Sequence, residues 1–173
     1  QILFHNQTGD LTAVRDKESG GLDVDTHVAS DIYVVHYLGG RPRKIQELPG
    51  GKLKYAADWS PDGRRIAFTT VDSLYLYDTE SYKSVSVFGR SGLYVAGLGS
   101  LDWSPDGRMI ALDAGVGFLF AGRLLMNTAP SQIWVVDTES GDARLLLDDK
   151  YLNVCPRWSR DGQHLLFISS RGR

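Results

Sequence analysis

Short apolar runs alternate with turn residues along the whole chain, and valine, isoleucine, phenylalanine and tyrosine dominate the runs. Residues of these kinds are enriched in strands, so the pattern predicts many short β-strands separated by turns. Three seven-residue segments repeat one another, each with tryptophan at its second position, at 58–64, 102–108 and 157–163. Each segment leads into an apolar strand, and the strands that begin at Ile66 and Ile110 lie about 44 residues apart, which indicates structural repeats.

The Asp-Gly pair at the tip of each repeated segment predicts a tight turn between two strands. Glycine tolerates a positive φ, and the proline before it in the first two copies presets the turn. We expect the tryptophans to lie in the core at the base of each hairpin. The three tip aspartates are expected to support the turns by accepting hydrogen bonds from nearby backbone N–H groups: Asp62, Asp106 and Asp161.

A second repeated pattern predicts two further strands in each unit. The expected third strands are 32–36, 74–78 and 133–137, and the expected fourth strands are 44–48, 85–88 and 144–147. Four such strands form a small antiparallel sheet, which cannot bury both of its faces alone. The sheets must therefore stack radially or face to face.

Together, the Trp-Ser-Pro-Asp-Gly hairpin, the Ile-Ala-Phe strand and the Ile-Tyr-Val-Val strand with its turn resemble the TolB-type, WD-like β-propeller repeat. The resemblance covers nearly the whole chain outside two insertions. It implies an all-β fold of four-stranded antiparallel blades, of which the chain holds about three and a half. We expect one partial propeller domain over 1–173, with blades at 1–50, 51–95 and 96–148 and a half blade at 149–173.

Both ends of the chain fall within a predicted blade. The first apolar run matches a second strand, and the last residues follow another second strand. Closed propellers have about four to eight blades. The sequence therefore predicts a partial ring, either as a fragment or as a chain that completes its ring by self-association.

The two insertions, 7–30 and 115–131, both fall between a second and a third strand, so we expect them on one face of the disk. In the first, Asp23, Asp25 and His27 alternate, and an extended backbone would place their side chains together. Carboxylate and imidazole groups bind divalent metals, which makes these residues weak metal candidates. The alternative is a polar surface loop.

The second insertion is rich in large apolar residues. An exposed patch of this kind often marks a contact surface, so we expect a protein partner on the face that carries the loops between strands two and three. The alternatives are that the segment packs against its own disk as a hairpin or short helix, or that it contacts a membrane. The candidate partner-binding residues are Phe118, Leu119, Phe120, Leu124, Leu125 and Met126.

Composition excludes several other functions. The 173 residues have a net charge of −2 and a pI near 6.1, which argues against a nucleic-acid surface. The single cysteine, Cys155, cannot form a disulfide within the chain or a zinc site by itself. No apolar run is long enough to span a membrane. We expect no cofactor, and the sequence contains no Gly-x-Ser-x-Gly nucleophile motif.

Two functions are compatible with these features. The first is a non-enzymatic protein–protein interaction or scaffold module that uses the loop face. The similarity of the chain to TolB-type blades implies a bacterial, extracytoplasmic location, either periplasmic or associated with the envelope. The alternative is the propeller domain of a serine peptidase resembling the prolyl oligopeptidase family, in which such blades gate a separate catalytic domain that lies outside this chain.

Overall fold

The structure of the chain is a computed structural model, and all of its described elements are β-strands. It describes the backbone of residues 2–8, 13–15, 22–24, 29–49, 54–70, 72–89, 100–115, 119–120, 123–124 and 130–172. Side chains are described from Ser30 onward in these ranges, except in 119–120 and 123–124. This part of the chain contains no helix with the length and hydropathy needed to cross a membrane.

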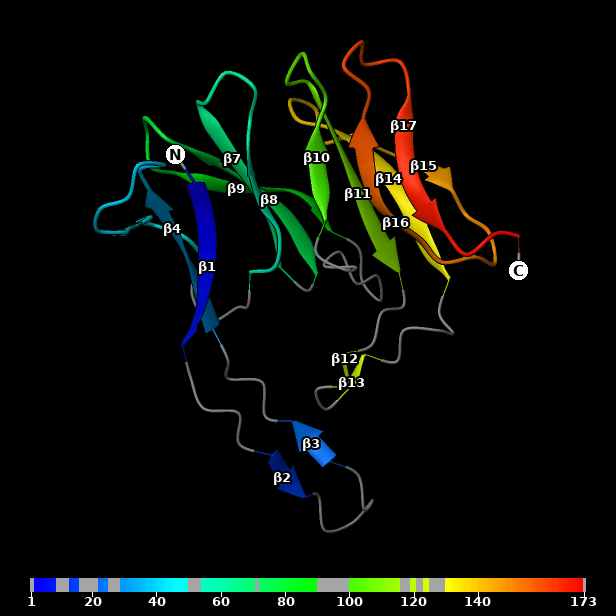
Figure 1. Ribbon diagram of the computed structural model, residues 1–173, viewed down its shortest axis with the longest axis horizontal. Coiled ribbons are helices and arrows are strands. Elements are labelled where there is room, and N and C mark those ends of the chain that lie inside the picture. The colour runs from blue at the N-terminus through cyan, green and yellow to red at the C-terminus, as the bar shows by residue number, and fades with distance from the viewer. Residues whose placement is uncertain are drawn as a thin grey trace.

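Two complete four-stranded antiparallel blades form the middle of the molecule (Figure 1). Blade 2 has the order β6 (Ala57–Trp59), β7 (Arg65–Thr69), β8 (Ser73–Asp78) and β9 (Ser84–Gly89). Blade 3 has the order β10 (Leu101–Trp103), β11 (Met109–Gly115), β14 (Ser131–Asp137) and β15 (Ala143–Leu147). The predicted all-β fold of four-stranded antiparallel blades is thereby confirmed.

Two incomplete blades flank them. Blade 1 has the order β1 (Ile2–Thr8), β4 (Ala29–Val35) and β5 (Arg43–Lys44), and blade 4 pairs β16 (Asn153–Trp158) with β17 (Leu165–Ser169). The prediction of a fourth strand at 44–48 was wrong in extent, because β5 ends at Lys44. Glu47 has a φ of 58°, in the left-handed region, and this turns the backbone away from the extended conformation.

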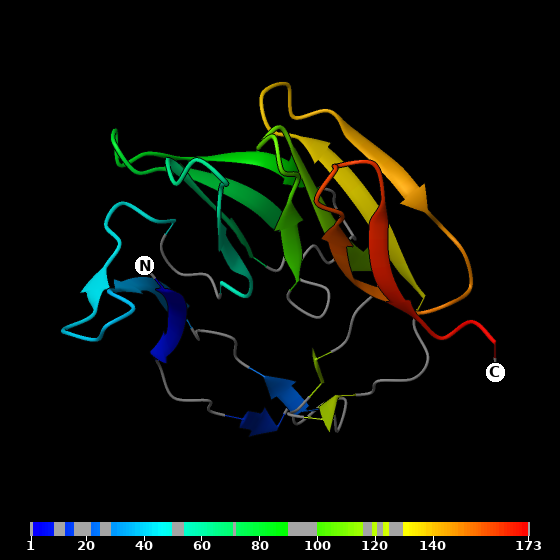
Figure 2. The ribbon, with the colours of Figure 1, turned by 45° about the horizontal axis from the view of Figure 1, so that its top comes forward.

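The two small hairpins that the structure describes within the insertions lie on one side of the blades (Figure 1). The β1–β4 ladder continues to the pair Thr8–Ala29, so regular pairing extends into the range expected for the first insertion. Within the insertions, β2 (Ala13–Arg15) pairs with β3 (Leu22–Val24), and β12 (Leu119–Phe120) pairs with β13 (Arg123–Leu124). Both small hairpins lie below the blades in Figures 1 and 2, on the side away from the tryptophan hairpins.

The core lies between neighbouring blades. In the seam between blades 1 and 2, Ile32 and Val34 pack with Ile66 and Phe68. The seam between blades 2 and 3 contains a larger cluster: Ala67, Leu74, Leu76, Trp103, Ile110 and Leu112. Successive residues of β7 enter different seams, because side chains alternate across a strand. Stacking therefore buries both faces of blade 2.

Candidate functional site

Each tryptophan hairpin closes with the same pair of polar residues. In blade 2, the Asp62 Oδ1 accepts hydrogen bonds from the Ser60 hydroxyl at 2.6 Å and from the Arg64 N–H at 3.0 Å. The serine hydroxyl, followed by the Arg64 N–H, holds the pKa of Asp62 below its ordinary value. Gly63 has a φ of 72°. Blades 3 and 4 repeat the serine–aspartate contact at 2.5 Å, which confirms the predicted turn role of the tip aspartates.

A second capped turn joins the third and fourth strands of blade 3. The Asp137 Oδ1 accepts hydrogen bonds from the Ser140 N–H at 3.0 Å and the Glu139 N–H at 2.9 Å. The Arg108 Nε lies 3.1 Å from the other carboxylate oxygen. These backbone donors, with Arg108 as a smaller cause, lower the pKa of Asp137 to about 2. Asp137 is therefore ionised at neutral pH and does not serve as a general acid.

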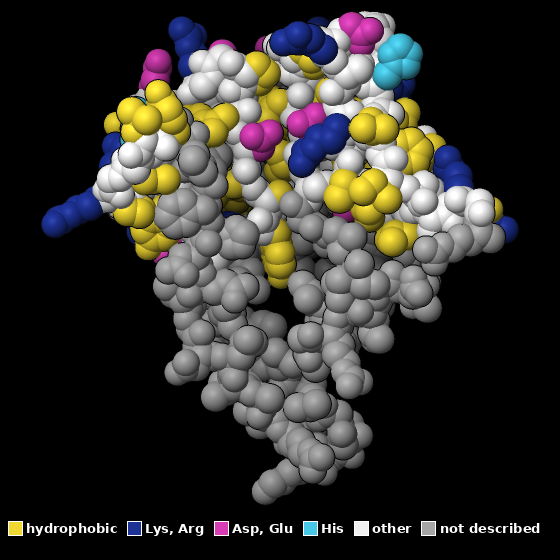
Figure 3. Space-filling view, viewed as in Figure 1, with side chains coloured by type: hydrophobic (Ala, Val, Ile, Leu, Met, Phe, Trp, Pro, Cys, Tyr) yellow, Lys and Arg dark blue, Asp and Glu magenta, His cyan; other side chains and the backbone are white. Residues whose placement is uncertain are grey.

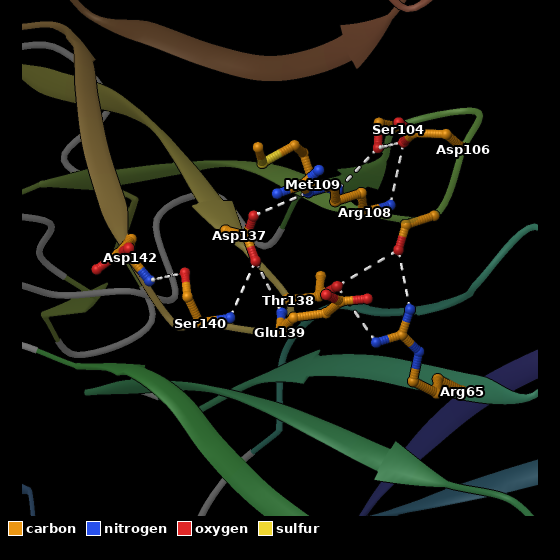
Figure 4. A network of polar contacts seen from close by, with 11 residues as sticks. Arg65, Ser104, Asp106, Arg108, Met109, Asp137, Thr138, Glu139, Ser140 and Asp142 are labelled. Carbon is orange, nitrogen blue, oxygen red and sulfur yellow. Dashed lines mark hydrogen bonds and ion pairs between the residues drawn. The ribbon is translucent and has the colours of Figure 1, made fainter.

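Arg65 connects blade 2 to both turns of blade 3, as Figure 4 shows. Its Nη1 donates to the Thr138 hydroxyl at 3.2 Å, and its Nη2 donates to the Gly107 carbonyl at 2.9 Å. The guanidinium carbon lies 5.1 Å from the centroid of the Trp103 ring, within range of a cation–π interaction. The Arg65 side chain thus holds blades 2 and 3 together at the end of their interface where the turns lie.

The innermost strands form a second set of contacts between blades. The Trp103 indole N–H donates to the Asp58 carbonyl at 3.3 Å, linking β10 to β6. The Asp102 carboxylate accepts a 2.6 Å hydrogen bond from the Trp158 backbone N–H and lies 3.5 Å from Arg157. Burial, with the nearby Asp102 charge as a smaller cause, raises the pKa of Asp58.

At the ends of the interfaces away from these turns, two serines, Ser30 and Ser131, link neighbouring blades. The Ser30 hydroxyl accepts from the Lys54 backbone N–H at 2.7 Å, and the Lys54 Nζ donates to the Ser30 carbonyl at 2.7 Å. Lys54 is only 3% exposed, and this burial lowers its pKa. In blade 3, the Ser131 hydroxyl accepts from the Asn153 N–H at 2.7 Å and donates to its carbonyl. These contacts hold neighbouring blades together.

The residues selected from the insertions fall largely outside the described part of the chain. Asp23 lies in β3, but its side chain is not described, and Asp25 and His27 lie outside the described residues. Leu119, Phe120 and Leu124 belong to β12 and β13 by backbone pairing alone. Phe118, Leu125 and Met126 also lie outside the described residues. The metal and partner sites therefore stay predictions, and the described residues contain no group of three potential metal ligands.

Sequence reasoning missed the two arginines that bridge the blades. Arg65 gives no repeat signal, because methionine and histidine occupy the equivalent positions at Met109 and His164. Arg157 does give a signal in the repeat, because it occupies the position at which the other two hairpins carry Asp58 and Asp102. A reversal of charge at one position of a repeat predicts an ion pair between neighbouring units.

Comparison with known proteins identifies relatives of this arrangement, although no family model matches the sequence. The uncharacterized peptidase YuxL of Bacillus subtilis is 28% identical over 149 residues, covering 82% of this chain and 18% of that protein. Among solved structures, TolB from Acinetobacter baumannii superimposes with a TM-score of 0.63 and 22% identity, covering 83% of this chain and 33% of TolB. The tricorn protease gives a TM-score of 0.60 and 16% identity, covering 84% of this chain and 13% of the protease.

These similarities support the fold and its partial extent. The described blades match part of a TolB-type β-propeller and part of the propeller-containing tricorn protease. The chain spans about a fifth of the length of the peptidase that it matches in sequence. The predicted resemblance to TolB-type propellers is confirmed, in the form of a structural similarity over part of that protein's length.

Proposed function

We propose that the chain is part of a β-propeller that accompanies a peptidase and controls the access of substrates to a catalytic centre located outside these residues. The observation that carries this proposal is the match to YuxL, which extends over 82% of the chain. At that coverage the match must include the two central tryptophan hairpins, at 58–64 and 102–108, and it leaves most of the peptidase outside the aligned region.

The chemistry of the described site favours a structural contribution to such an enzyme. Polar side chains between the blades bind one another: Arg65 donates a hydrogen bond to Thr138, and Asp102 forms an ion pair with Arg157. The pKa of Asp137 lies far below neutrality, so this carboxylate is suited to holding a turn rather than to moving protons. Blades held together by such contacts would form a barrier in front of the catalytic centre that admits or excludes substrates according to their size.

Active-site labelling tests where catalysis takes place. A fluorophosphonate probe reacts with serines that are activated as nucleophiles. Treated in parallel, the whole protein is expected to become labelled and the 173-residue chain to stay unlabelled. Labelling of the chain itself would contradict the proposal, and so would a whole protein that neither reacts with the probe nor cleaves peptides.

Substrate size tests the gating role. Replacing Arg65 by methionine in the whole protein loosens the seam between blades 2 and 3, because it removes two hydrogen bonds. We expect kcat/KM to rise for a long peptide and to stay unchanged for a dipeptide substrate. A proportional change for both substrates would indicate general damage to the enzyme and would oppose gating.

Docking of a separate protein on the insertion face stays a prediction. It rests on the apolar residues of the second insertion, from Phe118 to Met126. Substituting Phe120 by serine would weaken partner capture under that reading. The same substitution would leave peptide cleavage unchanged, so the two functions give different results.

A further inference from the structure

Each tryptophan hairpin ends in an Asp-Gly pair, and such a pair can rearrange chemically. The backbone nitrogen of the glycine can attack the side-chain carboxyl carbon of the aspartate, because glycine places no side chain in the way. A C–N bond forms, a C–O bond breaks, and one water molecule leaves with the amide hydrogen. Water then opens the ring at either carbonyl, which gives aspartate again or isoaspartate, whose main chain runs through the former side chain. Each hairpin tip is therefore a candidate modification site.

The folded tips of blades 3 and 4 hold the attacking nitrogen in the same way. In blade 3, the Gly107 N–H donates a hydrogen bond to the Ser104 carbonyl at 2.8 Å. In blade 4, the Gly162 N–H donates to the Ser159 carbonyl at 2.9 Å. This contact closes the turn, so the nitrogen can approach the carboxyl carbon only after the turn opens locally.

The same turns keep the two carboxylates charged. The Asp106 Oδ1 accepts hydrogen bonds from the Ser104 hydroxyl at 2.5 Å and from the backbone N–H two residues later at 3.0 Å. The Asp161 Oδ1 accepts from the Ser159 hydroxyl and the corresponding N–H at the same two distances, 2.5 and 3.0 Å. In both blades the serine hydroxyl, followed by the backbone N–H, lowers the pKa of the aspartate. The carboxylate must take up a proton before its oxygen leaves as water, so ring closure again requires an open tip.

The two tips differ in the support that they receive from the preceding blade. The Arg65 Nη2 of blade 2 donates to the Gly107 carbonyl at 2.9 Å, and Gly107 is buried. The residue of blade 3 in the equivalent position of the sheet is Met109. A methionine side chain has no N–H or O–H donor. The Gly162 carbonyl accordingly accepts no hydrogen bond from any residue that the structure describes.

The other contacts of the two glycines are closely matched. Gly107 has a φ of 72° and Gly162 a φ of 68°. A Cβ placed on either glycine would meet the proline of the preceding tip, 3.6 Å from Pro61 or 3.7 Å from Pro105. The Thr138 hydroxyl adds only a longer contact, 3.4 Å, to the carbonyl of the blade 3 tip. The main difference in hydrogen bonding between the tips is therefore the arginine of blade 2.

We infer that the Asp161-Gly162 pair is a site of spontaneous isomerisation to isoaspartate, and that Arg65 protects the Asp106-Gly107 pair from the same reaction by holding its tip closed from the preceding blade. Isoaspartate lengthens the main chain by one carbon and moves the carboxylate to the α-carbon. The hydrogen bond that closes the blade 4 tip is then lost, and the β16–β17 hairpin is weakened. The inference does not depend on the peptidase proposal.

The test follows isoaspartate in the whole protein that contains this chain, kept at neutral pH. The modified residue is measured at each tip by digestion and mass spectrometry, with an isoaspartyl-specific methyltransferase as a second readout. Short unfolded peptides that copy residues 103–110 and 158–165 give the intrinsic rate of each sequence. Relative to its own peptide, the Asp161 tip is expected to react about 2- to 10-fold faster than the Asp106 tip, the range that one hydrogen bond accounts for.

An arginine variant isolates the protecting contact. Arg65→Met gives the blade 3 tip the same kind of neighbour that the blade 4 tip has in Met109. We expect isoaspartate at Asp106 to form about 2- to 10-fold faster in this variant, while the rate at Asp161 stays unchanged. The matched variant Arg64→Met removes one charge at an exposed position, and it is expected to change neither rate.

Two results would overturn the inference. The first is an equal rate at the two tips of the native protein relative to their peptides, which includes the absence of isoaspartate at both. The second is an equal rise at Asp106 and Asp161 in the Arg65→Met variant, because that would indicate general unfolding. Peptide cleavage enters neither measurement, so failure of this inference is distinguishable from failure of the proposed function.

Discussion

The seam between blades 2 and 3 and the outer face of blade 4 are built on the same strand pattern but differ in solvent exposure. Ala67 of β7 pairs with Asp58, and Leu166 of β17 pairs with Arg157, so the two residues occupy equivalent positions. Ala67 is 0% exposed, whereas Leu166 is 74% exposed. Two residues further along, Thr69 is 1% exposed and Ile168 is 64% exposed.

The difference shows that the strands of one blade do not bury both faces of their own sheet. The second face is buried only where a neighbouring blade covers it. Alternation along the strand decides which side chains point towards the following blade, and a neighbouring sheet decides whether they are buried. Where blade 3 stacks on blade 2, the side chains join a continuous cluster. Apolar side chains are visible on the β17 side of the face shown in Figure 3.

The largest expected effect is a difference in unfolding free energy between alanine variants of two leucines on the equivalent strands β11 and β17. Leu112 of β11 is 0% exposed in the seam cluster, and Leu166 is 74% exposed. A Leu112→Ala variant should lose about 2–5 kcal/mol of unfolding free energy, because it leaves a cavity. A Leu166→Ala variant should change it by less than about 0.5 kcal/mol. Urea denaturation measures both, and equal losses would contradict the stacked arrangement.

A smaller effect is expected at the polar end of the same seam. Arg65 donates to Thr138 and Gly107 across the seam, while its neighbour Arg64 has an exposed side chain. An Arg65→Met variant should lose about 1–3 kcal/mol of unfolding free energy, because the buried Gly107 carbonyl then keeps only its longer hydrogen bond, 3.4 Å from the Thr138 hydroxyl. The matched Arg64→Met variant should stay within about 0.5 kcal/mol of the native chain. A similar loss in both variants would mean that Arg65 does not bridge the blades.

The smallest effect concerns pH. Asp137 has a folded pKa of about 2, below the ordinary aspartate pKa of 3.8, so its stabilising contribution is present above pH 3.8. That contribution is lost as the pH falls from 3.8 towards 2. An Asp137→Asn variant keeps an acceptor for the Ser140 N–H but lacks the charge, so its Tm should fall less over this range. A pH profile of the Asp137→Asn variant identical to that of the native chain would contradict the assignment.

Much of the fold was predictable because its signals are local. The Asp-Gly turns and the tryptophan register depend on residues within one hairpin, and the structure reproduces them at Asp62 and Gly63. The bridge from Arg65 to Thr138 was not predictable, since its partners lie 73 positions apart and the arginine is not repeated. The candidate metal and partner residues are in insertions, where no repeat constrains the backbone. Their side chains lie outside the described part of the chain.

Thiol reactivity at two equivalent positions tests the stacking of blades most directly. Ala111 and Leu166 both lie opposite the residue before a hairpin tryptophan, yet their exposures are 0% and 74%. Cysteine is introduced at each position in a Cys155→Ser background and treated with a thiol reagent. We predict that the Leu166→Cys variant reacts at the rate of a free thiol and the Ala111→Cys variant at least about 100-fold more slowly, since labelling there requires local opening. Equal rates at the two positions would contradict the account.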